Sequence, residues 1–330
     1  MSMTNLNANV GIDLGSNASK LANDNKIIAA IDGSDLLTLR EESEVYFDEP
    51  VFSCVVAVPD SMTKRAREDL IFKAKKAGFK NINVISAREA MIKALENKNK
   101  EKILVYDFGA SKSEIIIFRG DEVLDAEIIN DVSGDEFDKI FAQWLSERFT
   151  LNLIDKNTLL ARAMRIKIAL STTDFVTWRD ISITRDDFER LVRFSIKRAS
   201  HTVERFLECY KPSRFILTGG CSEIPIVRRV FRDLYSNLEL DLGLIARGAS
   251  IDARLLSSVQ QSQKLDRQLK LREIRSELME LEDFLTRKQK DRIYFLFRQA
   301  EGLLTNDPAL IKLLENLTKE IKKEESGIKN

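Results

Sequence analysis

The sequence predicts an α/β fold of two related lobes, followed by an all-α helical appendage. Two observations predict the lobes: a pattern of strand, glycine turn, strand and helices occurs twice, and a later strand ends in a third glycine turn. Each lobe would be a sheet covered by helices. A third observation, the scarcity of glycine and β-branched residues after about residue 257, predicts the appendage. We expect the first lobe over 1–118, the second over 119–257 and the appendage over 258–330.

The elements of the first half follow from apolar runs and from the residues that start or stop them. Val10–Leu14 is an apolar run closed by Gly15, which is typical of a buried strand entering a tight turn. Short strands with a turn at Asp32–Gly33 are expected over 26–48. The other expected elements are a strand over 52–58, a helix from Ser61 or Thr63 to Lys76 that ends at Gly78, a strand over 83–85, a helix over 87–97, and a hairpin of strands over 102–107 and 114–118.

Helices dominate the second half of the lobed region. Thr184 is expected to cap a long helix over 185–209, because Asp186 and Asp187 lie in its first turn, where acidic groups are stabilising. The other expected elements are helices over 135–149, 157–170 and 225–235 and strands over 181–183 and 215–217. A continuous doubly wound sheet is the alternative to two lobes, but the hairpin after Asp107 does not fit such a sheet.

Apolar residues recur at helical spacing in the appendage, with charged residues between them. They are Leu265, Leu269, Ile274, Leu278, Leu281 and Leu285. Further helices are expected over 288–304 and from Asn306–Asp307–Pro308 to Lys322. The stripe fits either a helical hairpin folded onto itself or its neighbouring lobe, or a coiled-coil or partner-binding face.

Composition limits the possible functions. Lys+Arg and Asp+Glu number 52 each, so the balance of charge gives no support for a nucleic-acid or lipid-surface partner. The apolar runs are shorter than a membrane span needs, and the amino terminus lacks the pattern of a secretory signal. Cys54, Cys209 and Cys221 are isolated, which favours a reducing cytoplasm over disulfides or a zinc site. The expectation is a cytoplasmic protein with no nucleic-acid or membrane partner.

Two motifs place an acid at the end of a strand and a glycine turn directly after it. They are GIDLGSNAS, with Asp13 and Gly15, and VYDFGASKSEIII, with Asp107 and Gly109. Backbone N–H groups of such a turn can bind phosphates, and the carboxylate can hold a hydrated Mg²⁺. Two of these strand ends facing each other would enclose a metal-bound nucleotide from both sides.

A third glycine turn, TGGCSEIP over 218–225, completes the set. Gly219 and Gly220 carry no Cβ, so an adenosine can pack closely against them. Each motif alone occurs in many proteins, whereas the three in this order are much more specific.

In order and wording, these motifs resemble the nucleotide-binding domain of the DnaK-type heat-shock chaperones. The resemblance covers about residues 8–257. It also includes SGDEFDKIF (133–141), RIKIALS (165–171), ITRDDFERLV (183–192) and IARGASIDA (245–253). The family has a bilobal actin-like ATPase fold, so this fold is expected here.

The resemblance also implies the site residues. Asp13 and Asp107 would hold Mg²⁺ through water, and both would act in catalysis together with Lys112 and Glu114. The nucleotide, ATP or ADP, would contact Gly15, Ser16, Asn17, Gly109, Ala110, Ser111, Gly134, Lys167, Ser171, Gly219, Gly220, Cys221 and Glu223.

Several of these positions depart from the family pattern. In the second phosphate motif Ala110 and Ser111 replace glycines, Lys112 replaces a threonine and Glu114 an aspartate. Lys112 could either restore positive charge near the γ-phosphate or point into solvent.

Other departures remove polar and charged groups that the family uses. Ala87, Met164 and Glu223 stand where the family has a glutamate, a glutamate and an arginine. The interval from Asp13 to Asp107 is about half the family's, which implies a trimmed first lobe without the catalytic lysine. No residue over 20–50 is a convincing replacement for that lysine. Phosphoryl transfer depends on positioned charge and water, so these losses imply slow hydrolysis.

The leading functional expectation is a DnaK-like nucleotide-binding protein with weak or slow ATPase activity, acting as a switch for a protein partner. The partner could bind through the C-terminal helices, and no segment after Ala253 predicts the peptide-clamping β-sandwich of the chaperones. The alternatives are a pseudo-ATPase interaction scaffold with a degenerate cleft and an actin-like filament-forming protein.

Overall fold

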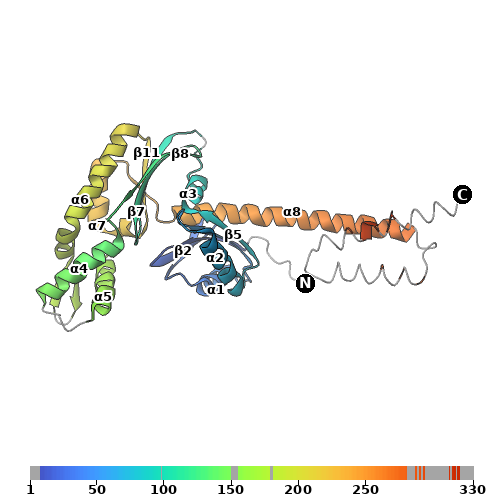
Figure 1. The fold of residues 1–330 in the computed structure, drawn as a ribbon, viewed down its shortest axis with the longest axis horizontal. Helices are drawn as coiled ribbons and strands as arrows, with labels where there is room; N and C mark the ends of the chain where they lie inside the picture. Colours follow the sequence, from blue (N-terminus) through green and yellow to red (C-terminus); the bar gives the residue numbers. More distant parts are fainter. Residues whose placement is uncertain are drawn as a thin grey trace. The chain divides into compact units, whose positions relative to one another are not determined.

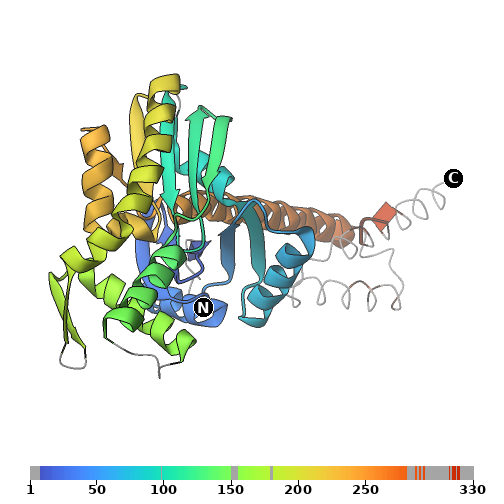
Figure 2. The same cartoon turned by 60° about the vertical axis from the view of Figure 1, so that its left-hand side comes forward.

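The computed structural model describes residues 8–97, 99–149, 155–178 and 181–280, together with 287, 290, 293, 312, 314–316, 318 and 319. The chain divides into two compact units, Met1–Arg254 and Leu255–Asn330. The first unit contains two five-stranded sheets, which Figures 1 and 2 show as separate groups of strands with helices around them. The doubly wound alternative, one continuous sheet, is therefore wrong, and a mixed α/β fold with two sheets is correct.

The first sheet has the strand order β3-β2-β1-β4-β5. β1 pairs antiparallel with β2 and parallel with β4, so its carboxyl end lies between a hairpin and a parallel strand. The sheet packs on a core that includes Val10, Ile12, Val56 and Leu70. Its elements are β1 (Asn9–Leu14), β2 (Ala18–Asn23), β3 (Lys26–Asp32), α1 (Leu36–Phe47), β4 (Ser53–Val58), α2 (Lys64–Lys76), β5 (Asn81–Ser86) and α3 (Ala87–Leu95).

The second sheet has the strand order β12-β11-β6-β7-β8, and α6 packs against β6 and β7 (Figure 1). β6 pairs antiparallel with β7 and parallel with β11, which repeats the arrangement around β1. The strands of this sheet and the elements around it are β6 (Lys102–Phe108), β7 (Ser113–Arg119), β8 (Glu122–Ile129), α4 (Gly134–Arg148), α5 (Lys156–Leu170), α6 (Arg185–Tyr210), β11 (Arg214–Thr218), η1 (Gly220–Glu223), α7 (Pro225–Leu234) and β12 (Glu239–Leu240). Between α5 and α6, β9 (Phe175–Trp178) and β10 (Ile181–Thr184) pair with each other in a separate two-stranded antiparallel sheet.

The strands expected over 26–48 are only partly correct. β3 ends at Asp32, and the rest of the segment forms helix α1. Asp35 caps this helix by accepting a hydrogen bond from the Thr38 backbone N–H at 3.0 Å, and Leu36 and Leu39 lie buried on one face. The aspartate cap and the spacing of these leucines predict a helix, and the expectation of strands over 26–48 did not take them into account.

Most of the other expected elements are confirmed. Thr63 caps α2 through the Ala66 N–H, and Thr184 caps α6 in a reciprocal capping box with Asp187. Four strands were not expected, namely β2, β8, β9 and β12. The expected division of the lobes after residue 118 cuts between β7 and β8, whereas the second sheet already includes β6 from Lys102 onward.

Helix α8 (Leu244–Glu280) begins against the first sheet and α3. A Cβ at Gly11 of β1 would lie 2.1 Å from the Ser250 backbone nitrogen, and one at Gly248 would lie 1.7 Å from the Ala90 carbonyl oxygen. Only glycine permits both approaches. The ion pair of Lys93 with Asp252, at 2.6 Å, adds a polar contact between α3 and α8.

The second unit includes the whole of the expected appendage, 258–330. Within the stripe, Ile274 is buried and Leu269 is half exposed. The helices expected over 288–304 and from Asn306 to Lys322 lie largely outside the described residues. Among the described residues, no helix is long and apolar enough to cross a membrane.

Candidate functional site

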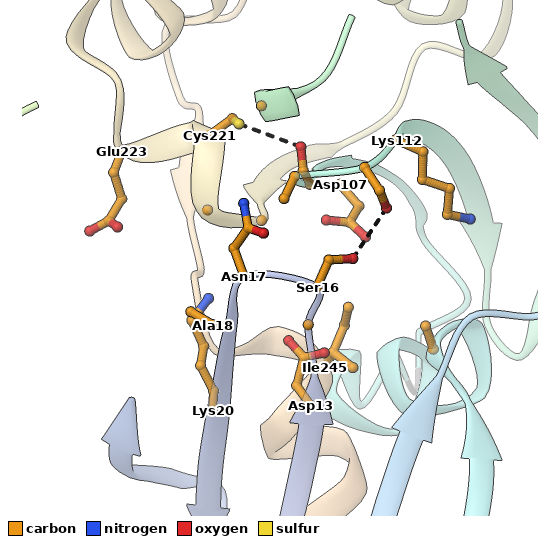
Figure 3. Close-up of a pocket in the computed structure, with 18 of the residues that line it drawn as sticks. Asp13, Ser16, Asn17, Ala18, Lys20, Asp107, Lys112, Cys221, Glu223 and Ile245 are labelled. Carbon is orange, nitrogen blue, oxygen red and sulfur yellow. Dashed lines mark hydrogen bonds between the residues drawn. The ribbon is translucent and has the colours of Figure 1, made fainter. Parts of the chain in front are cut away.

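The first unit contains a cavity of about 660 Å³ between the carboxyl ends of β1 and β6, η1 and the helices nearby (Figure 3). Every residue that the sequence analysis assigned to catalysis, metal or nucleotide lines it. These are Asp13, Gly15, Ser16, Asn17, Asp107, Gly109, Ala110, Ser111, Lys112, Glu114, Gly134, Lys167, Ser171, Gly219, Gly220, Cys221 and Glu223. The structure thus brings residues from three separate glycine turns to one place.

The first turn joins β1 to β2 and carries Asp13 at its start. Asp13 lies directly opposite Lys20 in the antiparallel ladder, so the two side chains project from the same face of the sheet. Burial raises the pKa of the Asp13 carboxyl above its ordinary value, and the charge of Lys20 partly opposes this rise. Both side chains enter the cavity in Figure 3.

The second turn joins β6 to β7 and carries Asp107 in the equivalent place. Burial, together with the nearby charge of Asp13, raises the pKa of Asp107 to about 7, although the charges of Lys112 and Lys20 partly oppose the rise. The two acids therefore repel each other within one cavity. The turns also touch, because the Ser16 hydroxyl donates to the Ser111 hydroxyl at 3.3 Å.

Glu114 of β7 is buried and is held by two cations. The Lys112 ammonium lies 2.8 Å from one carboxylate oxygen, and the Arg88 guanidinium bonds the other. Arg88 also pairs with Asp60 at 3.4 Å. Although burial opposes it, these hydrogen bonds and charges lower the pKa of Glu114. Lys112 therefore neither points freely into solvent nor lies unpaired at the phosphate position.

The third turn, between β11 and α7, forms a second wall. Gly219 has a φ of 84°, and a Cβ there would lie 2.4 Å from the Phe108 carbonyl oxygen, whereas a Cβ at Gly220 would meet nothing within 4 Å. Gly220 thus opens directly onto the cavity. The Cys221 thiol donates to the Gly109 carbonyl at 3.4 Å, and burial raises its pKa to about 12, so it stays a thiol. Glu223 is exposed at the cavity edge.

The wall formed by α4 and α5 is closed by a buried ion pair. The Lys167 ammonium lies 2.8 Å from the Asp138 carboxylate and donates to the Gly134 carbonyl at 3.0 Å. The Ser171 hydroxyl donates to the Lys167 carbonyl at 3.2 Å. The polar groups of Lys167 and Ser171 are thus bound to the protein itself.

Five charged residues of the cavity were not predicted from the sequence, and they are Lys20, Asp32, Asp60, Arg88 and Arg228. Lys20 lies within the segment in which no replacement for the family's lysine was expected. Strand alternation from Asp13 through the hairpin could have placed it on the acidic face. Arg88 directly follows Ala87, the position at which the family has a glutamate, and its place in the sequence gives no signal of its own.

A hydrated Mg²⁺ fits the acidic pair better than a fully protein-ligated ion does. Within the described parts of the chain, no group of three or more His, Cys, Asp or Glu side chains could hold a metal. Two half-buried carboxylates with raised pKa values in one cavity gain from a cation between them, and Mg²⁺ usually keeps several waters.

The comparisons with known proteins identify the family. The model of the Hsp70 protein family matches residues 18–276. The chain is 28% identical over 263 residues to a chaperone protein HscA homolog of Rickettsia bellii, covering 75% of this chain and 44% of that protein. It is 29% identical over 259 residues to a chaperone protein dnaK of Cyanidioschyzon merolae, covering 67% and 43%. The chain thus spans less than half the length of these relatives. From the extent of the family match, this chain belongs to the Hsp70 family.

Proposed function

We propose that this chain binds ATP or ADP with Mg²⁺ in the cavity, hydrolyses ATP slowly, and acts as a chaperone-like switch for a protein partner. One observation carries the proposal: three glycine turns from distant parts of an Hsp70-family chain line a single cavity of about 660 Å³. A cavity of this size is in the range that holds small ligands and cofactors.

The proposed roles follow from the contacts. Asp13 and Asp107 would hold the hydrated Mg²⁺, which supplies positive charge that offsets the phosphates when bound. The backbone N–H groups of the first two turns would receive phosphate oxygens. Gly220 leaves room for the nucleoside, because nothing lies within 4 Å of the place where a Cβ would be.

Slow hydrolysis is proposed because the groups that would position a water are absent or bound. Ala87 has no polar side chain, and both carboxylate oxygens of Glu114 are taken by Arg88 and Lys112. Losing a stabilising group of this kind costs about 10²–10³ in rate. The same observation favours a second candidate function, a nucleotide-binding scaffold without turnover.

Calorimetric titration of Mg-ATP and Mg-ADP into the purified protein tests the proposal. We expect micromolar binding that Asp13→Ala and Asp107→Ala abolish. Asp69→Asn, on the exposed face of α2, is the matched control and should bind as the wild type does. Absence of heat at millimolar nucleotide would contradict the proposal. Where binding is found, a single-turnover assay separates a slow ATPase from a scaffold.

A second variant tests whether the ligand occupies the cavity. Gly220→Val places a side chain in open space, so it should weaken nucleotide binding at least tenfold and leave thermal unfolding nearly unchanged. Unchanged affinity would place the nucleotide elsewhere.

The protein partner is proposed from the chaperone relatives, and the C-terminal region is its proposed binding element. A partner whose affinity depends on the bound nucleotide should co-purify with this chain to different extents in the presence of Mg-ATP and of Mg-ADP. Asp13→Ala should remove this difference. A partner bound equally in both states would argue for the scaffold.

A further inference from the structure

Five basic residues line the cavity within the described residues, and four of them are engaged by the protein. Lys112 and Arg88 bind Glu114, and Lys167 binds Asp138. The Arg228 Nε donates to the Ser222 carbonyl at 2.8 Å. Lys20 differs from the other four, since the described part of the chain gives its ammonium neither a hydrogen bond nor an ion pair.

The position of Lys20 is fixed by the sheet. In one row across the cavity face, Lys20 pairs with Asp13 on one side and with Ala30 on the other, and Asp13 pairs in turn with Ala57. Side chains opposite each other in a ladder share a face. The two alanines that flank the pair fill little space, so the ammonium and the carboxylate reach into the cavity without a bulky neighbour.

We propose that Lys20 binds the phosphate chain of a nucleoside di- or triphosphate, the role that the sequence analysis had considered for Lys112. The inference rests on the proposed nucleotide-binding function and names the cation that recognises the phosphates. Lysine presents three donors on a flexible stem and acts as a point charge toward phosphate.

The charges around Lys20 support this assignment. Its field opposes the raised pKa of both Asp13 and Asp107, so it acts on the two acids that would hold the metal. Phosphates bound beside these acids would add negative charge, and among the described residues the Lys20 ammonium could offset it with all three of its N–H donors available. Lys112 would first have to leave Glu114, at a cost, because a buried carboxylate would lose one of its two cations.

A different role for Lys20 would be to balance the charges of Asp13 and Asp107 in the folded protein. That role predicts a change in stability and equal effects on all ligands. The phosphate role predicts an effect that depends on the number of phosphates. Ligands that share the nucleoside but differ in their phosphates therefore separate the two roles.

The experiment is calorimetric titration of Mg-ATP, Mg-ADP and adenosine into the wild type and into Lys20→Met, Lys20→Arg and Lys112→Met. Loss of one charge-assisted contact should weaken Mg-ATP and Mg-ADP binding to Lys20→Met by about 10–100-fold. Adenosine binding should change by less than about twofold, and Lys112→Met should weaken Mg-ATP binding less than Lys20→Met does. Lys20→Arg should recover part of the loss because it keeps the charge.

Each outcome decides a separate point. A wild type that binds Mg-ATP and a Lys20→Met variant that binds it equally well would overturn the role of Lys20 alone. An equal loss for adenosine and Mg-ATP would show a structural role and also overturn it. A wild type that binds neither Mg-ATP nor Mg-ADP would overturn the proposed function and this inference with it. Thermal unfolding of each variant, compared with the wild type, establishes that the protein titrated is folded.

Discussion

The two hairpins of the cavity in which a strand ends in an acid and a glycine turn share one backbone arrangement. They differ in the charge of the residue that lies opposite the acid. In the first, Asp13 pairs across the ladder with Lys20, and in the second, Asp107 pairs across the ladder with Glu114. The partner is thus a cation in one lobe and an anion in the other. Lys20 is left without a protein partner in the described chain, whereas Glu114 is bound on both carboxylate oxygens.

This difference shows that the same hairpin backbone can present either an available cation or a neutralised anion to the cavity. The hairpin places the residue opposite the acid on the cavity face in both lobes, whatever its type. Neighbouring residues then decide whether it remains available. Arg88 and Lys112 neutralise Glu114, which makes the second hairpin part of the structure and leaves the first hairpin available to a ligand.

The largest expected effect on stability comes from removing Glu114, the residue of the second hairpin that is bound by two cations. Glu114→Ala leaves Arg88 and Lys112 without their shared carboxylate, and we expect a loss of about 2–4 kcal/mol in the free energy of unfolding. Urea denaturation measures the loss. The matched control is Glu122→Ala, which removes an exposed ion pair with Arg119 at the end of the same strands and should cost well under about 1 kcal/mol. Equal effects of the two variants would contradict a special role for Glu114.

The next effect is the pH dependence of that loss. The folded protein lowers the pKa of Glu114, so its ionised form stabilises the fold above the ordinary pKa of the carboxyl, and this contribution disappears as the pH falls through the lowered value. The difference in unfolding free energy between the wild type and Glu114→Gln should therefore shrink from pH 7 toward pH 3. A difference that grows with acidity would contradict the lowered pKa.

A smaller effect on stability is expected from reversing the charge of Lys20, the residue of the first hairpin that is available to a ligand. Lys20→Glu adds a third carboxylate beside Asp13 and Asp107 without the two cations that Glu114 has, and should cost about 1–2 kcal/mol of stability. Added MgCl₂ should recover more of this loss than added NaCl at equal ionic strength. Lys26→Glu, on an exposed position of β3, serves as the control. Equal recovery by both salts would indicate simple screening.

The smallest effect belongs to the contact between the two turns. The hydrogen bond from Ser16 to Ser111 is exposed and 3.3 Å long, so Ser16→Ala and Ser111→Ala should each change stability by less than about 0.5 kcal/mol. Thermal unfolding checks this. A larger loss would mean that the turns hold the lobes together by themselves.

Local signals in the sequence were enough to place most of the fold. The apolar strands that end in an acid and a glycine, and the caps at Thr63 and Thr184, agree with the structure. Helix α1 was missed because its cap and leucines follow a turn that looked like the end of another strand. β9 and β12 are short, with four and two residues, and pairing with partners outside the segment defines them.

The cavity was predicted better than its electrostatics. Glycine turns and acids at strand ends can be recognised from short stretches of sequence. The lining residues predicted in this way lie together in the cavity. The ion pairs of Arg88 and Lys167 join residues far apart in the chain, and the register of a hairpin decides the position of Lys20. Such contacts depend on tertiary structure, which a pattern along the chain does not contain.

The contact of Gly11 and Gly248 with their neighbours also bears on the order of folding. The strands of the second sheet lie between Lys102 and Leu240, so that sheet can be complete before α8 has been synthesised. The first sheet begins at Asn9, but its packing is complete only when α8 has formed, because Ser250 packs against Gly11. The Asn25 N–H also donates a hydrogen bond to the Ser250 hydroxyl. Because long-range contacts close late and slowly, we expect the lobe made first on the ribosome to be the last one finished.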